Sequence, residues 1–163
     1  LLLSDVAFHL VRLTAREPAW AEVIPNLVFG RRLLASETRP EWVSVLDLAA
    51  EFEEVPTLRD SPGYRSLPLL DATAPTETDL KSAIEWIATE IGKGQVYVHC
   101  ALGHGRSACV VIGYLLAVGA VASVEEGIGL LRSKRSGVRL HHQQRDRLEL
   151  SFGRAGSRER PVS

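Results

Sequence analysis

The segment VYVHCALGHGRSACVV, at positions 96–111, constrains the fold of this chain more than any other. It joins a β-branched apolar run to a short loop with two glycines, and then to a stretch that is apolar on most sides. The first run is typical of a buried strand and the last of a buried helix. The segment therefore predicts a strand, a tight loop and a helix in direct succession.

The rest of the chain repeats this alternation. Further strands are predicted at 43–49 and 64–71, with short extended pieces around a turn at 23–34 and a loop at 51–63. Helical spacing of apolar residues predicts helices at 3–16, 76–91, 107–118, 123–134 and 141–150. Strands that alternate with helices predict an α/β fold with a central, mostly parallel sheet flanked by helices.

Composition narrows the class of protein. A length of 163 residues suits one domain, and a net charge of −1 argues against a nucleic-acid partner. With only two cysteines, a disulfide framework is not expected and a reducing, cytoplasmic compartment is favoured. The sequence holds no methionine, so we expect a fragment or a processed chain, with an N-terminal helical segment at 1–20, a main domain at 21–152 and a flexible tail at 153–163.

The loop between the predicted strand and helix has the features of an anion site. Backbone N–H groups at a helix N-terminus lack internal partners, and the helix dipole favours negative charge there. Gly103 and Gly105 allow the backbone to curl around one point, and Arg106 adds a planar set of donors that matches phosphate oxygens. The predicted phosphate-binding residues are Ala101, Leu102, Gly103, His104, Gly105 and Arg106.

The same electrostatic field acts on Cys100. A thiol at a helix N-terminus and near a guanidinium is readily deprotonated, and a thiolate beneath a bound phosphate is a nucleophile for phosphorus. We expect His99 to face away and to order the loop through hydrogen bonds, and Ser107 to donate to the sulfur. The alternative, an inert buried Cys100, fits this loop composition poorly, whereas Cys109 among apolar residues is expected to pack in the core.

The stretch HCALGHGRSA resembles the signature loop of the cysteine-dependent protein tyrosine phosphatases, with His-Cys, five intervening residues, Arg and Ser. The small size and lack of long inserts are similar to the dual-specificity branch, and the resemblance extends over about positions 23–150. It implies hydrolysis of phosphate monoesters through a phosphocysteine, with Cys100 and Arg106 as catalytic residues. It implies no cofactor, and no metal-ligand spacing stands out.

Departure of the leaving oxygen requires a proton, which this family takes from an aspartate upstream of the cysteine. Asp71 follows an apolar extended segment and precedes Cys100 by 29 positions, so the resemblance implies that Asp71 is the general acid. Asp79 is the competitor, but its position in a first helical turn is explained by capping. Asp60 lies in a polar loop without a strand leading to it.

Three functions compete at this stage. The first is a protein phosphatase for phosphotyrosine and also phosphoserine or phosphothreonine. The second is a lipid phosphatase for phosphatidylglycerophosphate or phosphoinositide headgroups, at the cytoplasmic face of a membrane that an absent upstream region would reach. The third, a catalytically inactive phosphate-binding module, is disfavoured because Cys100, Arg106 and Asp71 are all present, and a rhodanese-type sulfur carrier would need no upstream Asp71.

Several side chains near the loop stay open. His104 is a candidate for contact with a second acidic group on the substrate, and the basic run at 132–139 is either a solvated face or a docking surface. The acidic run at 51–54 is expected to be solvated. The roles of Gln143 and Gln144 and the oligomeric state are not predicted.

Overall fold

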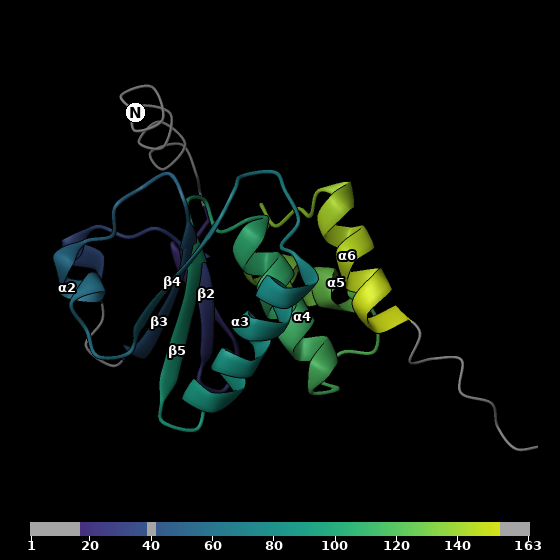
Figure 1. Cartoon of the computed structure of the whole chain (residues 1–163), viewed down its shortest axis with the longest axis horizontal. Coiled ribbons are helices and arrows are strands. Elements are labelled where there is room, and N and C mark those ends of the chain that lie inside the picture. The colour runs from purple at the N-terminus through teal and green to yellow at the C-terminus, as the bar shows by residue number, and fades with distance from the viewer. Residues whose placement is uncertain (1–16, 39–41, 154–163) are drawn as a thin grey trace, which may run out of the picture.

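In the computed structural model, which describes residues 17–38 and 42–153, a five-stranded sheet is covered by helices (Figure 1). The strands are β1 (Trp20–Ile24), β2 (Leu27–Arg31), β3 (Trp42–Ala49), β4 (Tyr64–Leu69) and β5 (Gln95–Cys100). Their order is β1-β2-β5-β3-β4; the pairs β2–β5, β5–β3 and β3–β4 are parallel and β1 is antiparallel to β2. The predicted α/β fold with a mostly parallel sheet is confirmed.

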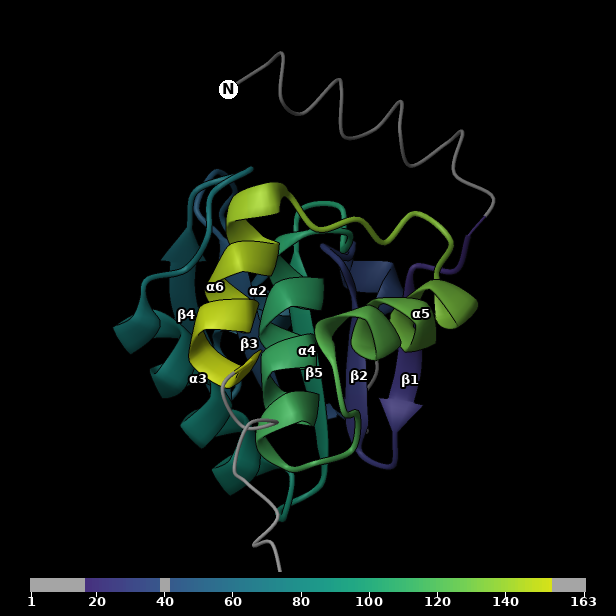
Figure 2. The ribbon, with the colours of Figure 1, turned by 90° about the vertical axis from the view of Figure 1, so that its right-hand side faces the viewer.

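The helices divide unequally between the two faces of the sheet. They are η1 (Ala35–Glu37), a 3-10 turn, α2 (Pro56–Arg59), α3 (Glu77–Glu90), α4 (Arg106–Ala117), α5 (Val124–Lys134) and α6 (His142–Phe152). One face is covered by α3, α4, α5 and α6, with α4 in the middle of this layer, and α2 lies on the opposite side (Figures 1 and 2). The four longer helices match the segments predicted at 76–91, 107–118, 123–134 and 141–150.

The residues of β5 alternate between the two faces, as the pleat of a strand requires. Val98 and Cys100 belong to the apolar core between the sheet and the four-helix layer. Tyr97 belongs to the smaller core on the other face, and its ring stacks on that of His99 with centroids 5.3 Å apart. Strand β5 therefore sends Cys100 toward the helices and His99 away from them, as predicted.

Helix α4 is the central helix of the layer and contacts α3, α5 and α6. Residues 106–115 are all buried, which agrees with the prediction of a helix that is apolar on most sides. The helix begins directly after the glycine loop, so its N-terminal turn faces the end of β5. This arrangement places the loop between a buried strand and a buried helix, both of which hold it rigidly.

The structure corrects one detail of the predicted elements. The segment 51–63 is not entirely loop, because Pro56 starts the four-residue helix α2. Proline suits a first helical turn, and Leu58 anchors the short helix to the core. The predicted helix at 3–16 lies outside the described residues, as does the tail beyond 153.

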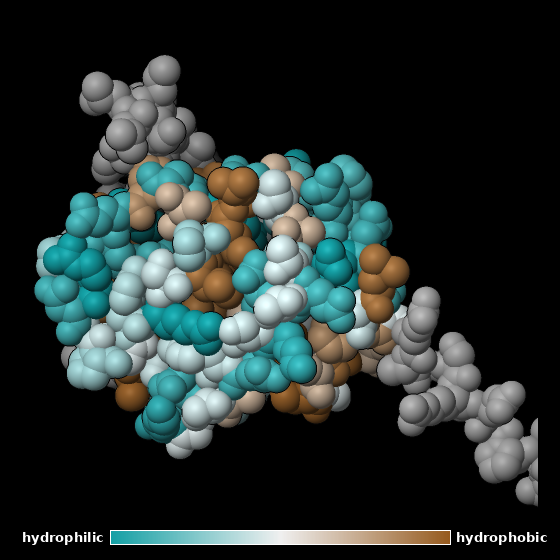
Figure 3. Space-filling view, in the orientation of Figure 1, coloured by the Kyte–Doolittle hydropathy of each residue, from teal (hydrophilic) through white to brown (hydrophobic). Residues whose placement is uncertain are grey.

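The surface of the described residues is mostly polar on the face seen in Figure 1, with apolar residues gathered in a few small areas (Figure 3). Large apolar side chains that are well exposed include Leu70, at the end of β4. Within 17–38 and 42–153, no helix combines the length and the apolar character needed to cross a membrane.

Candidate active site

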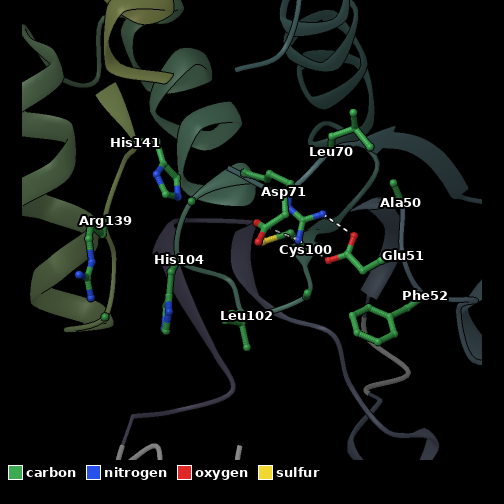
Figure 4. Close-up of a pocket in the computed structure, with 14 residues that line it drawn as sticks. Ala50, Glu51, Phe52, Leu70, Asp71, Cys100, Leu102, His104, Arg139 and His141 are labelled. Atoms are coloured by element: carbon green, nitrogen blue, oxygen red, sulfur yellow. Dashed lines mark hydrogen bonds and ion pairs between the residues drawn. The ribbon is translucent and has the colours of Figure 1, made fainter. Parts of the chain in front are cut away.

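A pocket of about 610 Å³ opens at the edge of the sheet where β3, β4 and β5 end (Figure 4). Because these strands are parallel, their carboxyl ends meet at one edge, which is where open α/β sheets bind ligands. The pocket is lined by Ala50, Glu51, Phe52, Leu70, Asp71, Cys100, Ala101, Leu102, His104, Gly105, Arg106, Gly137, Arg139 and His141. Cys100, Asp71 and all of the predicted phosphate-binding residues except Gly103 thus line one cavity.

The six backbone carbonyls of residues 100–105 all find donors outside the loop or in the helix that follows. Arg32 N–H donates to the carbonyls of Cys100 and Ala101, and the Arg135 guanidinium donates to those of Leu102 and Gly103. Arg139 N–H donates to the His104 carbonyl, and Cys109 N–H donates to the Gly105 carbonyl. A trans peptide group points its N–H opposite to its C=O. Each N–H of residues 101–106 therefore points away from the donor that holds the preceding carbonyl, and one of them, Gly103 N–H, donates to Cys100 Sγ at 3.3 Å.

Cys100 lies at the bottom of this loop and is almost fully buried. Its Sγ is 3.4 Å from Ser107 Oγ, in addition to the Gly103 amide, and it forms no disulfide with Cys109. A thiolate at this position can only accept hydrogen bonds, so it would accept from both the Gly103 amide and the Ser107 hydroxyl. Burial raises the pKa of Cys109 to about 12, which keeps that thiol neutral.

Gly103 has a backbone conformation that other residues avoid. Its φ is +73°, and a Cβ at this position would meet the Arg135 guanidinium and the backbone of Gly30. The close approach is possible only without a side chain. The glycine therefore allows Arg135 to reach the loop carbonyls.

Arg106 is the first residue of α4, and its guanidinium has five N–H donors. Nη1 donates to Glu51 Oε2 at 2.6 Å and to Leu69 O at 3.0 Å, and Nη2 donates to Glu51 Oε1 at 2.5 Å. Nε is buried and has no hydrogen-bond partner among the described residues. Nε–H thus has no acceptor among the described residues, and Nη2 has one hydrogen beyond its Glu51 bond, with Asp71 Oδ1 at 3.4 Å from Nη2. These two hydrogens form the side of the guanidinium that matches two oxygens of a phosphate.

Glu51 corrects the prediction that the 51–54 run is solvated. It follows the end of β3, and its carboxylate accepts two hydrogen bonds from Arg106. Burial raises the pKa of this carboxyl, but the hydrogen bonds and charge of Arg106 outweigh burial, so the pKa of Glu51 lies below its ordinary value. Arg106 is in turn held charged, because Glu51 counters the effect of burial and raises the pKa of the guanidinium.

Asp71 lies at the mouth of the pocket, in a turn that follows β4 (Figure 4). Its Oδ1 is 3.4 Å from Arg106 Nη2, while 79% of its side chain is exposed to solvent. The competing Asp79 lies in the first turn of helix α3 and takes part in its cap: the hydroxyl of the N-cap residue Thr76 accepts from the Asp79 backbone N–H at 3.1 Å and donates to the Asp79 carboxylate at 2.7 Å. Of the two aspartates, Asp71 is the one that lines the pocket with Cys100.

His99 does not make the loop hydrogen bonds that we predicted. On the face of the sheet opposite Cys100, its Nε2 lies 2.8 Å from Glu54 Oε2 and 3.9 Å from Asp47 Oδ1. Burial raises the pKa of Glu54, but His99 lowers it more, so the pKa of the Glu54 carboxyl is below its ordinary value. The prediction failed because β5 buries this face against the 51–54 segment, which was expected to be solvated.

His99, Glu54 and Asp47 also form a group of metal-ligand type that the sequence analysis missed. One ligand atom from each lies within 4.8 Å of the others, and all three side chains are buried. Asp47 already accepts hydrogen bonds from the Tyr64 hydroxyl at 2.8 Å and from Ala49 N at 2.9 Å. Both oxygens of the Asp47 carboxylate thus accept hydrogen bonds from protein donors, so their burial is explained without a metal ion.

Arg135 was predicted as part of a basic run but is 1% exposed. Its guanidinium donates to the carbonyls of Leu102, Gly103 and Pro18 and to the carboxylate of Glu17. It thereby ties the loop to the segment that precedes β1. Glu17 also contacts His104 Nε2, which fixes the imidazole at one side of the pocket.

The comparisons with known proteins agree with this geometry. The family profile described as "Dual specificity phosphatase, catalytic domain" matches residues 44–150, and no curated protein sequence matches the chain.

Three of the similar solved structures come from differently named proteins. Tk-PTP in its active form has a TM-score of 0.74 at 24% identity and covers 84% of this chain and 98% of its own; PTPMT1 in complex with PI(5)P has 0.74 at 20%, covering 84% and 96%. Human DUSP28 has 0.72 at 17%, covering 86% and 97%. At these identities the structural likeness shows the fold.

Proposed function

Because the chain belongs to the family of dual specificity phosphatase catalytic domains, we propose that it hydrolyses phosphate monoesters through a phosphocysteine at Cys100. The observation that carries the proposal is that one pocket brings together the buried Cys100 sulfur, which accepts from the Gly103 amide, and Arg106, whose Nε has no hydrogen-bond partner among the described residues. We assign the catalytic domain to residues 21–152.

In the first step the Cys100 thiolate attacks phosphorus and the bond to the leaving oxygen breaks. The amides of residues 101–106 and the Nε and Nη2 hydrogens of Arg106 bind the three non-bridging oxygens, where charge spreads in the transition state. Asp71, at the mouth of the pocket, protonates the departing oxygen. The product of this step is a phosphocysteine and a neutral alcohol or phenol.

In the second step a water molecule attacks the phosphocysteine. The Asp71 carboxylate accepts a proton from that water, the P–S bond breaks and inorganic phosphate leaves. The sulfur departs as a thiolate, and the Ser107 hydroxyl and the Gly103 amide, at 3.4 and 3.3 Å, stabilise it. The enzyme then returns to its starting protonation state.

A phosphoprotein is the first candidate substrate, carrying phosphotyrosine and also phosphoserine or phosphothreonine. Support comes from the apolar side chains of Ala50, Phe52 and Leu102, which line the pocket above the sulfur and suit an aromatic ring. A phosphotyrosine held in this way would place its phosphate on the 100–106 loop and its ester oxygen near Asp71.

A phospholipid is the second candidate, and a different wall of the pocket favours it. His104, Arg139 and His141 lie on one side (Figure 4), and Leu70 at the rim is 69% exposed. A wall with one arginine and two imidazoles as hydrogen-bond partners, next to an apolar rim, suits an anionic headgroup that stays attached to its acyl chains. PTPMT1, one of the similar structures, was solved in complex with PI(5)P.

The substrate class is tested by phosphate release from a phosphotyrosine peptide, a phosphothreonine peptide, phosphatidylglycerophosphate and a phosphoinositide. The Cys100→Ser variant serves as the blank. We expect the highest kcat/KM with the phosphotyrosine peptide. Turnover confined to the two lipids would replace the first candidate with the second, and no turnover of any phosphate monoester would refute the proposed function.

Replacing Asp71 with asparagine should slow hydrolysis of phosphates with basic leaving groups by about 10²- to 10⁴-fold, because the leaving oxygen then departs without its proton. Activated aryl phosphates, whose phenols leave unaided, should lose much less in the first step. The measurement is kcat/KM for a series of aryl and alkyl phosphates. Asp79→Asn is the matched control and should behave like the wild type, and an equal loss on every substrate would assign the proton to another group.

Replacing Glu51 with glutamine should reduce kcat/KM by about 10- to 100-fold, because Arg106 loses the charged partner that orients it. The thermal stability of the variant should also fall. Since the pKa of Glu51 is lowered in the folded state, its contribution to stability is present above the unfolded-state pKa of about 4.3 and is lost as pH falls through the folded-state pKa. The stability difference should therefore shrink below about pH 4. A difference that persists unchanged at acid pH would contradict the ion pair.

A further inference from the structure

Gln144 is a buried polar residue in the first turn of α6 that the mechanism above does not use. Its side chain is fully buried, with 0% of the residue exposed. Nε2 donates to the carbonyl of Thr73 at 3.0 Å, and Oε1 accepts from the backbone N–H of His141 at 3.1 Å. The amide group also lies against Gly105 of the 100–106 loop, where a Cβ would come within 3.3 Å of Oε1. The Gln144 side chain is thus held between the 70–73 turn, the start of α6 and the 100–106 loop.

Thr73 ends the turn that carries Asp71. Within this turn the Thr73 hydroxyl donates to Leu70 O at 2.8 Å, and Ala72 has a φ of +59°, which is uncommon for a residue other than glycine. A turn with such a conformation needs support from its surroundings. The Asp71 side chain gives the turn little support, because it is 79% exposed and its Oδ1 is 3.4 Å from Nη2 of Arg106.

Two side chains support the turn from outside. Arg106 donates to Leu69 O at 3.0 Å, just before the turn, and Gln144 donates to Thr73 O at its end. Arg106 belongs to the 100–106 loop, which we call the phosphate cradle, so the entry to the turn is already tied to the loop that is proposed to bind phosphate. Gln144 provides the second link between the turn and this loop, since it donates to Thr73 O and packs against Gly105 of the phosphate cradle.

We propose that Gln144 is a positioning residue for proton transfer: it holds the 70–73 turn against the phosphate cradle and thereby keeps the Asp71 carboxyl over the leaving oxygen. The inference rests on the proposed function and deepens it. Gln144 acts through Asp71 and does not itself touch the reacting atoms. Without the Thr73 bond, the exposed aspartate would sample positions from which it cannot protonate the leaving group.

The test is a double-mutant cycle with Asp71. Gln144→Met keeps the length of the side chain and removes both hydrogen bonds, and Gln143→Met, at the exposed neighbouring position, is the matched control. We expect Gln144→Met to lose about 10- to 100-fold in kcat/KM, which reports the first step, for phosphates with basic leaving groups and little in kcat/KM for activated aryl phosphates. Affinity for inorganic phosphate should be unchanged. In the Asp71→Asn background the same change should have no further effect on kcat/KM, because the group that Gln144 positions is gone.

Other outcomes overturn the proposal. A loss that is equal for all leaving groups, or that adds in full to Asp71→Asn, would make Gln144 a general structural residue. A burst of alcohol release followed by slow turnover with basic leaving groups would place Gln144 in the hydrolysis of the phosphocysteine and not in its formation. A failure of the proposed function itself looks different, since the wild type would then be inactive or Asp71→Asn would show no dependence on the leaving group.

A second variant covers the case in which Gln144→Met fails to fold. Gln144→Glu keeps the length and the acceptor for His141 N–H but places an oxygen where Nε2 donates to Thr73. It should reproduce the selective loss on basic leaving groups, and its affinity for inorganic phosphate, measured separately, reports the effect of the added charge. Wild-type selectivity in this variant would overturn the proposal.

Discussion

Replacing Cys100 with serine should abolish turnover, with a loss of about 10⁴-fold or more, while leaving the phosphate site intact. The serine hydroxyl has nearly the size of the thiol but stays protonated in this site, so it is a poor nucleophile. The loop amides and Arg106 should be unchanged, because the carbonyls of the loop are held by Arg32, Arg135 and the backbone. Binding of inorganic phosphate should therefore persist in the variant.

Two measurements on the same preparation check this expectation: phosphate release from a phosphotyrosine peptide and calorimetric affinity for inorganic phosphate. The matched control is Cys109→Ser, which changes the other, buried cysteine and should keep its activity if it folds. Substantial turnover by Cys100→Ser would remove this cysteine from the reaction. Loss of phosphate affinity together with turnover would instead mean that the substitution has disrupted the loop.

Replacing Arg106 with lysine should cost about 10³- to 10⁵-fold in kcat/KM, the range seen when an arginine that stabilises phosphoryl transfer is removed. Lysine keeps the charge, but it lacks the two parallel hydrogens on Nε and Nη2 that the structure leaves available for phosphate. It also cannot bind both oxygens of Glu51 while donating to Leu69 O. Affinity for inorganic phosphate should fall along with kcat.

Arg59→Lys is the matched control for this prediction. Arg59 lies on α2 and forms exposed ion pairs with Glu53 and Asp60, which contribute little to stability. It should retain wild-type kinetics. If Arg106→Lys kept most of its kcat/KM, the charge alone would suffice, and the assignment of the free side of the guanidinium to phosphate would be wrong.

The fold was predictable where the sequence pattern is local and strong. Strand β5 and helix α4 were predicted because their apolar runs are too long and too continuous for surface segments. Helix α3 was predicted from apolar residues at helical spacing and from Thr76, whose hydroxyl caps the Asp79 amide as expected. The four-residue helix α2 was missed because so short a segment shows no periodicity, and only the proline at its start marks it.

The site was predictable only where its residues are contiguous. The sequence predicted that Cys100, Arg106 and Ser107 would lie together because one loop carries them all. Glu51 was assigned to solvent as part of an acidic run, and 55 positions separate it from Arg106 in the sequence. The two residues meet only because β3 and β5 are parallel neighbours in the sheet. An acidic residue just past the end of a buried strand was the signal for it.

Arg135 and Gln144 could not be predicted from local pattern. Arg135 sits in a basic run, which is usually solvated, and its burial depends on the glycine at position 103 that lets it approach the loop. Gln144 meets Thr73 across 71 positions through packing of α6 against the loop. Contacts of this kind depend on tertiary packing, which the sequence pattern does not encode at either residue.

The most direct test of the central claim is to identify the residue that carries phosphate during turnover. Asp71→Asn, mixed with an activated aryl phosphate and quenched in acid, should accumulate the intermediate, because the variant lacks the group that activates water. Peptide mass mapping is predicted to place one phosphoryl group on the peptide that contains Cys100. The Asp71→Asn/Cys100→Ser double variant should carry none. Phosphate on any other residue, or none on the protein while aryl alcohol is released in a burst, would contradict a phosphocysteine mechanism.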